Sequence, residues 1–294
     1  MSRLATAARV LGDVWSHPAN RGRQPHALAR FLGWQAWHRL TRQPLHARVF
    51  GGARLVVHPG DHSAVSALYA ELPDYAEMSF LKRLLRPGDA FLDVGANVGL
   101  YTVFASTLVG ETGKIFAVEP VADARWRLME NIAANRLQNV VVFPFVVGDV
   151  AGWSRVTSDA GTMNYVTEFV AGEEAPPGDA WVRAESLDSL LTSETPIAAK
   201  VDVEGFELHV LRGATALLKA HRPAAWLIEW NECARRYGAT QRDLWQLVTS
   251  TGGRIGRYSV EGNEVVSLHL DHEWPANVVI VMEDGFVRDR LRSR

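Results

Sequence analysis

The segment FLDVGANVG, residues 91–99, constrains the fold of this chain more than any other stretch. An apolar run ends in Asp93, and Gly95, Asn97 and Gly99 then lead into a second apolar run. Glycine permits a sharp turn and a close approach of the backbone to a ligand. The first turn of the following helix offers unpaired N–H donors. The pattern therefore predicts a strand, a ligand-binding loop and a helix.

From residue 90 onward, apolar strand-like runs alternate with helix-like runs, as a doubly wound α/β sheet requires. The strand-like runs are nearly continuous in apolar residues, which suits a parallel sheet covered on both faces. Ligands of such sheets bind outside the carboxyl ends of the strands. We expect strands at 90–94, 114–118, 139–147, 196–201, 224–230, 256–259 and 277–282, and helices at 99–108, 122–135 and 241–251.

Two cofactor classes use a loop of this kind. Dinucleotides require G-x-G-x-x-G, so that pyrophosphate can sit on the helix N-terminus; here the third glycine is missing and Asp93 would repel a pyrophosphate. A carboxylate suits the ammonium and sulfonium of S-adenosylmethionine instead. Glu119, at the end of the second strand, can accept both ribose hydroxyls, as it could in a nicotinamide site. The end of the third strand, Val147 to Asp149, suits the adenine edge, although Asp149 is also a natural turn residue.

The fourth predicted strand ends in a charged cluster. Lys200, Asp202 and Glu204 alternate, so they share one face of a strand. Ionisable groups at the end of an apolar strand are costly unless they pair or have a function. Asp202 or Glu204 could act as a general base with Lys200 balancing charge, and His209 is a weaker base candidate. The alternatives are a structural salt bridge, or a Mg²⁺ site whose ligands come from two strand ends, namely Asp202, Glu229 and Asn231.

The motifs FLDVGANVGLYT, AVEP and KVDVEGFELHVLRGA, in this order, resemble the FkbM family of S-adenosylmethionine-dependent methyltransferases. The resemblance spans roughly residues 50–283. It implies the class I methyltransferase fold, a mostly parallel seven-stranded sheet with an antiparallel last strand, and methylation of hydroxyls on sugars or polyketides. The cofactor residues it implies are Asp93, Gly95, Asn97, Gly99, Tyr101, Thr102, Glu119 and Pro120.

The expected organisation is a basic helical extension at 1–47 and a methyltransferase domain at 48–294. Residues 150–185 interrupt the alternation and predict a hairpin followed by a loop. This insert is either a substrate lid, on which Met163, Asn164 and Tyr165 could face a sugar, or a solvated loop.

The N-terminal extension is the most unevenly charged part of the chain. Residues 1–50 hold eight arginines and one acid, a charge of +7, and the chain total of -2 leaves -9 for the remainder. We expect the aromatic helix at 26–40 to pack on the main domain; the alternative is a basic amphipathic surface for a membrane or a partner. No apolar run reaches 18 residues, which predicts no membrane span.

The single cysteine, Cys233, suits a reducing cytoplasmic location, and the acidic main domain disfavours nucleic acid. We therefore expect an S-adenosylmethionine-dependent O-methyltransferase that acts on a glycan or a small-molecule hydroxyl. The alternatives are a nicotinamide-dependent oxidoreductase and an inactive binding protein that keeps the fold.

Overall fold

The computed structural model describes residues 3–157, 164–178 and 180–293. Its central sheet has the strand order β13-β12-β14-β11-β10-β3-β4-β5. Strands β3, β4, β5, β10 and β11 run parallel, whereas β14 is antiparallel to both β11 and β12. The predicted doubly wound α/β fold is confirmed. The strands are β3 (Ala90–Val94), β4 (Lys114–Val118), β5 (Val140–Phe143), β10 (Ala198–Val201), β11 (Ala225–Glu229), β12 (Arg254–Ser259), β13 (Glu264–Ser267) and β14 (Asn277–Val281).

An eighth strand, β13, was not predicted, because it has only four residues, lies at the sheet edge and buries only Val265, in part. It pairs only with β12, through an antiparallel register in which Gly256 faces Ser267. A short edge strand has one neighbour and no buried face, so it lacks the apolar run that is typical of a central strand.

Successive residues of the central strands point into two separate cores. Phe91 packs with α4 (Tyr75–Leu84) and α5 (Leu100–Val109), whereas Leu92 packs with α8 (Glu207–Arg212) and α10 (Gln241–Ser250). The helix α6 (Ala122–Ala134) packs on β4 through a smaller cluster. The remaining helices of this part are α3 (His62–Tyr69), α7 (Leu187–Leu190), α9 (Thr215–Lys219), α11 (Asp284–Arg292) and the 3₁₀ segment η2 (Glu232–Tyr237).

The predicted strand at 139–147 is wrong as one element. It breaks at Pro144, which cannot donate to a ladder. Residues beyond the break form β6 (Val146–Val147), which belongs to a separate sheet of order β6-β9-β7-β8. The other strands of this insert sheet are β7 (Gly152–Val156), β8 (Val166–Ala171) and β9 (Val182–Glu185). Strands β7 and β8 pair antiparallel, as the predicted hairpin requires.

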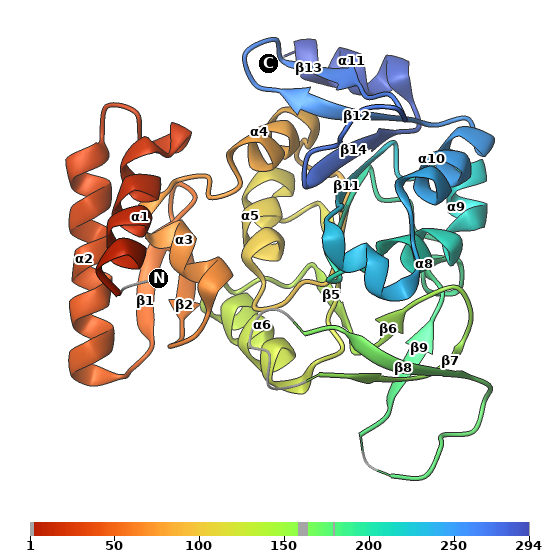
Figure 1. Cartoon of the computed structure of the whole chain (residues 1–294), viewed down its shortest axis with the longest axis horizontal. Helices are drawn as coiled ribbons and strands as arrows, with labels where there is room; N and C mark the ends of the chain where they lie inside the picture. The colour runs from red at the N-terminus through yellow and green to blue at the C-terminus, as the bar shows by residue number, and fades with distance from the viewer. Residues whose placement is uncertain (1–2, 158–163, 179, 294) are drawn as a thin grey trace.

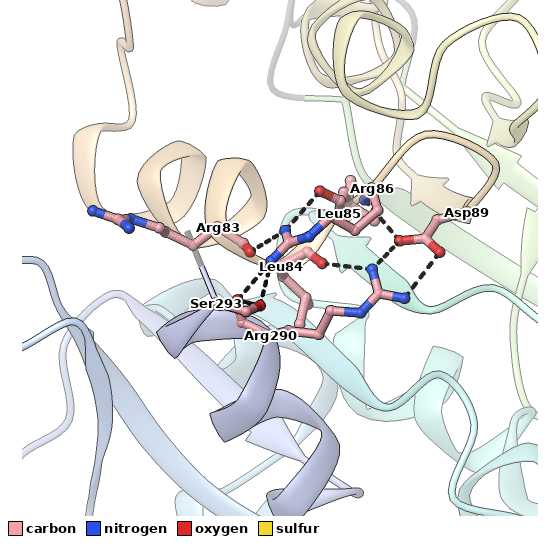
Figure 2. A network of polar contacts seen from close by, with 7 residues as sticks. All are labelled: Arg83, Leu84, Leu85, Arg86, Asp89, Arg290 and Ser293. Atoms are coloured by element: carbon pink, nitrogen blue, oxygen red, sulfur yellow. Dashed lines mark hydrogen bonds and ion pairs between the residues drawn. The ribbon is translucent and has the colours of Figure 1, made fainter.

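A polar clamp fixes the segment that leads into β3 (Figure 2). Arg290 of α11 donates to the Asp89 carboxylate at 2.6 and 3.2 Å and to the Leu84 carbonyl at 3.2 Å. Arg86 in turn donates to the Arg290 carbonyl at 2.7 Å and to the Ser293 hydroxyl at 3.1 Å. The C-terminal helix therefore holds the end of α4 and the start of β3, the strand that carries Asp93.

The N-terminal helices α1 (Arg3–Ser16) and α2 (Gln24–Thr41), joined through the 3₁₀ segment η1 (Pro18–Asn20), form an outer edge of the molecule (Figure 1). Helix α1 packs on α2, and α2 packs on α3, which in turn contacts the hairpin β1 (Leu45–Val49) and β2 (Ala53–Val57). Arg30 of α2 also donates to the Arg48 carbonyl of β1 at 3.4 Å. The expected packing of aromatic side chains on the main domain holds for Trp34, which is buried, but Trp37, Leu32 and Leu40 are exposed. In the described part of the chain, no helix combines the length and the apolarity needed to cross a membrane.

Candidate active site

An open cavity of about 210 Å³ lies at the carboxyl ends of β3, β4, β10 and β11. It brings together most of the residues singled out from the sequence: Asp93, Gly95, Asn97, Tyr101, Glu119, Pro120, Val147, Lys200, Asp202, Glu204 and Glu229. Five others lie outside its lining: Gly99, Thr102, Asp149, His209 and Asn231.

The glycine loop after β3 is held against the loop after β10. Gly95 has φ +79°, and a Cβ atom there would stand 1.8 Å from the carbonyl oxygen of Asp202. Only glycine tolerates both that torsion angle and that approach. Gly99 also has a positive φ, +91°, and a Cβ there would meet the Leu128 side chain at 2.7 Å. Both glycines therefore have left-handed backbone, but Gly95 lies against the loop after β10 and Gly99 lies against α6.

Asp93 and Glu119 are buried carboxylates at the carboxyl ends of β3 and β4. Thr102 donates to Asp93 at 2.6 Å, so Thr102 supports Asp93 from behind the cavity wall. Burial raises the pKa of Asp93 to about 6 against the opposing charge of Lys200. Glu119 accepts from the N–H groups of Asn97 and Val121, each at 2.8 Å. Burial raises the pKa of Glu119 to about 7 despite those bonds.

The charged cluster at the end of β10 is assembled by sheet register. Lys200 lies opposite Asp93 on β3 and Leu227 on β11, so its ammonium enters the cavity between neighbouring strands. Its Nζ lies 2.5 Å from Asp202 Oδ2 and 4.6 Å from the centroid of the Tyr101 ring. Tyr101 is itself fixed, because its hydroxyl donates to Asp74 at 2.7 Å. Lys200 is therefore a buried, oriented cation.

The acids of this cluster divide between charged and neutral forms. Burial opposes ionisation of Asp202, but the adjacent Lys200 ammonium outweighs it and holds the pKa of Asp202 below its ordinary value. Burial, with the Asp202 charge next, raises the pKa of Glu229 to about 9, so Glu229 carries a proton near pH 7. Burial and then Asp202 also raise the pKa of Glu204, whose backbone has the unusual φ of +54°. One carboxylate oxygen from each of Asp202, Glu204 and Glu229 lies within 4.8 Å of the other two.

Replacing Glu229 with Gln should change how stability depends on pH. A carboxyl group whose folded pKa is raised stabilises the fold below its unfolded pKa, near 4.5, and this contribution is lost as pH rises towards about 9. The carboxamide keeps a donor for Asp202 and does not ionise. We therefore expect the unfolding free energy of Glu229→Gln, relative to wild type, to increase between about pH 5 and about pH 9. Urea unfolding at both pH values measures this difference in unfolding free energy, and Glu264→Gln, at an exposed residue, is the control. A difference between Glu229→Gln and wild type that stays the same at both pH values would contradict the raised pKa of Glu229.

Two predicted residues lie together in an adjacent cavity. His209 Nδ1 lies 2.5 Å from the Asp149 carboxylate, and its ring stacks on Phe206 at 4.3 Å between centroids. That cavity is lined by Asp149, Val150, Val166, Thr167, Glu168, Phe169, Phe206, His209 and Tyr237. The chain turns after Val147, which carries Asp149 past the main cavity, and the helical position of His209 directs it to the same side.

Asn231 does not join the acidic cluster. Its side-chain oxygen accepts from the N–H of Cys233 at 2.7 Å and begins η2. Glu204 is the third acid beside Asp202 and Glu229 instead. Asn231 follows a strand end in the sequence, but the chain reverses there, and side-chain capping of a helix start is a common role of asparagine.

Three residues at or beside the site were not predicted from the sequence: Asp74, Phe145 and Glu207. Asp74 precedes α4 and reaches the cavity across the fold, with no local signal. Phe145 follows the break at Pro144. Glu207 is buried and accepts from the N–H groups of Val203 and Gly205, at 3.1 and 3.0 Å, which fixes the loop that carries Glu204. Its position in the segment VEGFE, directly after Asp202, is the sequence signal that could have identified Glu207.

The insert contributes to the cavity wall through Asn164 and Tyr165, both predicted to face a substrate, whereas Met163 lies outside the described residues. Arg236 of η2 adds a cation at this end. Its guanidinium stands 3.6 Å from the centroid of the Tyr165 ring and donates to the Glu204 carbonyl at 3.4 Å. The cavity wall here thus has an amide and an aromatic ring, and the exposed Arg236 lies on that ring from outside the lining.

Comparison with known proteins places this site in a family. The model of the methyltransferase FkbM domain matches residues 93–255. The hexuronic acid methyltransferase AglP of Haloferax volcanii is 29% identical over 205 residues, which are 66% of this chain and 78% of AglP. A solved FkbM methyltransferase from Methylobacillus flagellatus KT is 13% identical, with a TM-score of 0.43 over 87% of this chain and 60% of that one.

A solved O-methyltransferase from Thermotoga maritima is 11% identical, with a TM-score of 0.38 over 80% of this chain and 76% of that one. Both structural similarities are distant, so the assignment depends on the domain match, which covers more than half of the sequence and includes Asp93, Glu119, Asp202 and Glu229. This chain belongs to the FkbM family of S-adenosylmethionine-dependent methyltransferases.

Proposed function

We propose that the protein methylates a hydroxyl group of an acidic sugar. The observation that carries this proposal is the Lys200–Asp202–Glu229 cluster, which joins one ionised and one protonated carboxyl group at the end of the cavity. Methylation of a hydroxyl requires a group that takes its proton. The similarity to a hexuronic acid methyltransferase supports an acidic sugar as the acceptor.

The donor set of the cavity fits S-adenosylmethionine. The Glu119 oxygens, fixed by two backbone N–H groups, can accept the ribose hydroxyls, and Val147 and Phe145 offer apolar surface to the adenine. Asp93, Gly95 and Asn97 would hold the methionine part, with Thr102 positioning Asp93. When bound, the cofactor supplies an electrophilic methyl group on a sulfonium.

Within the cluster we assign proton acceptance to Asp202. It is ionised near pH 7, lines the cavity and is oriented by Lys200 at 2.5 Å. Glu229 is protonated under the same conditions and hydrogen-bonds Asp202, so it is not the acceptor. Asp202 would take the proton of the acceptor hydroxyl when that oxygen is methylated, and Lys200 compensates the charge of Asp202 before the proton arrives.

We infer that this chemistry requires no metal ion. The Lys200 ammonium already compensates Asp202 and would repel a cation held by Asp202, Glu204 and Glu229, and the Asn231 side chain is engaged elsewhere. We expect kcat in EDTA to stay within about twofold of the value in Mg²⁺. Loss of turnover in EDTA that Mg²⁺ restores would instead assign the three acids to a metal site.

Arg236 is our candidate for recognition of the acceptor carboxylate, because it stacks on Tyr165 at the cavity wall. Replacing it with Met preserves much of the stacking and removes the charge. We expect KM for a hexuronic acid to rise roughly tenfold or more, with the affinity for S-adenosylhomocysteine unchanged. Arg235→Met, one residue away and largely exposed, is the matched control. An equal effect of both variants would remove Arg236 from this role.

The decisive experiment combines calorimetry with product analysis. S-adenosylhomocysteine should bind the purified protein, and NAD should not. Hexuronic acids and their neutral hexose counterparts are then compared as acceptors with S-adenosylmethionine as the donor. A methyl ether on the uronic acid, stable to mild alkali, is the expected product. An alkali-labile methyl ester would show transfer to the carboxylate, which requires no base, and would overturn the proposed role of Asp202. Cofactor binding with no transfer to either class of sugar would refute the acceptor proposal.

A further inference from the structure

Both faces of α2 are apolar, and only one is covered. Its inner face packs Ala27 and Trp34 into the molecule. On the outer face, Leu32, Trp37 and Leu40 are 54%, 42% and 84% exposed. Leu32, Ala36 and Leu40 follow one another at intervals of four, so they form one row along the helix, with exposed Ala29 and Gly33 beside it. A surface helix normally turns charged or polar residues outward, so this face indicates a binding partner.

Basic residues border this outer face. At 100° per residue, Arg30 and Arg39 fall on its two opposite edges. At the C-terminal end of α2, a shallow cavity is lined by His38, Arg39, Arg42 and Pro59. The Nδ1 atom of His38 is buried and has no hydrogen-bond partner among the described residues. This cavity therefore offers two guanidinium groups, from Arg39 and Arg42, which are donors suited to a phosphate.

We propose that the outer face of α2 binds an anionic membrane surface. Leu32, Trp37 and Leu40 would enter the boundary between headgroups and acyl chains, where tryptophan is favoured, while Arg39 reaches outward to lipid phosphates. Arg30, whose guanidinium also donates to the Arg48 carbonyl at 3.4 Å, adds positive charge at the other edge. The cavity at His38, Arg39 and Arg42 would hold one headgroup. In Figure 1, α2 lies at the left edge, whereas the insert sheet, whose Val166 lines the catalytic cavity, lies at the lower right.

Charge favours a membrane over a second copy of the chain. Residues 1–50 carry +7, so pairing two copies through α2 would bring like charges together. An anionic bilayer instead attracts each arginine near its surface and accepts exposed leucine and tryptophan side chains. The proposal does not depend on the identity of the methyl acceptor.

Flotation of the full-length protein with phosphatidylcholine vesicles, with and without phosphatidylglycerol, tests the proposal. Binding should require phosphatidylglycerol and weaken at high salt. Leu32→Ser with Leu40→Ser should lower the partition coefficient at least about tenfold, because two leucine side chains no longer enter the bilayer. Arg39→Gln with Arg42→Gln should lower it roughly 30-fold through lost attraction to anionic lipid.

Matched controls are available elsewhere on the surface. Trp126 and Met129 of α6 are 57% and 49% exposed, so Trp126→Ser with Met129→Ser removes similar apolar area without touching α2. Lys219→Gln with Arg257→Gln removes two exposed charges in the same way. Both controls should bind vesicles as wild type does. Equal binding to neutral vesicles, or unchanged binding of the leucine variant, would refute the proposal. A dimer on size-exclusion chromatography that the leucine variant converts to a monomer would assign the face to self-association instead.

Discussion

Asp202→Asn is expected to lower kcat by about 10² to 10⁴-fold, because a carboxamide cannot take the proton of the acceptor hydroxyl. The asparagine oxygen can still accept a hydrogen bond from Lys200, so the pair at 2.5 Å keeps one polar contact and the fold should persist. The dissociation constant for S-adenosylhomocysteine should change by less than about threefold, because the proposed cofactor contacts are made by other residues. Single-turnover assays and calorimetry measure the two quantities separately.

Two variants serve as controls for this result. Asp149→Asn alters another ion-paired carboxylate, which faces the adjacent cavity beside His209, and should leave kcat within about threefold of wild type. Glu204→Gln addresses the second carboxylate in the cavity and should have a smaller effect than Asp202→Asn. If Glu204→Gln abolished turnover while Asp202→Asn retained it, Glu204 would be the base. If turnover of Asp202→Asn were normal, the whole cluster would be wrongly assigned.

Gly95→Ala is expected to weaken cofactor binding strongly and to destabilise the protein. The new Cβ would stand 1.8 Å from the Asp202 carbonyl oxygen, a backbone atom that cannot move without displacing the loop after β10. The φ of +79° at position 95 adds strain for any residue with a Cβ atom. Together these effects should cost roughly 3 kcal/mol or more in unfolding free energy and weaken S-adenosylhomocysteine binding by at least about 100-fold.

Gly51→Ala separates the torsional strain from the steric clash. Gly51 has nearly the same φ, +76°, but no heavy atom lies within 4 Å of the point that a Cβ atom would occupy there. We expect it to cost only about 1 kcal/mol in urea unfolding and to leave cofactor affinity unchanged. Equal effects of the two substitutions on stability and affinity would mean that the approach of the Gly95 loop to Asp202 is unimportant.

The sequence by itself determined the sheet and the first two strand ends. Buried parallel strands require long apolar runs, and their binding loops require glycine and polar residues immediately after each strand, so Asp93, Gly95 and Glu119 could be located from local pattern. The alternation of Lys200, Asp202 and Glu204 likewise placed them on one face before any contact was known. Pro144 was also visible, but the apolar residues on both sides of it concealed the break between β5 and β6.

Tertiary structure alone decided which of these groups meet and in what protonation state. The pairing of Lys200 with Asp202, the protonation of Glu229 and the arrival of Asp74 at Tyr101 depend on register and burial across segments far apart in the chain. The same holds for the separation of Asp149 and His209 from the main cavity and for the uncovered face of α2. Short-range steric preferences and the spacing of apolar residues determine whether a segment forms a strand, a loop or a helix. The pKa value and the exposure of a side chain depend instead on what the rest of the fold brings near it.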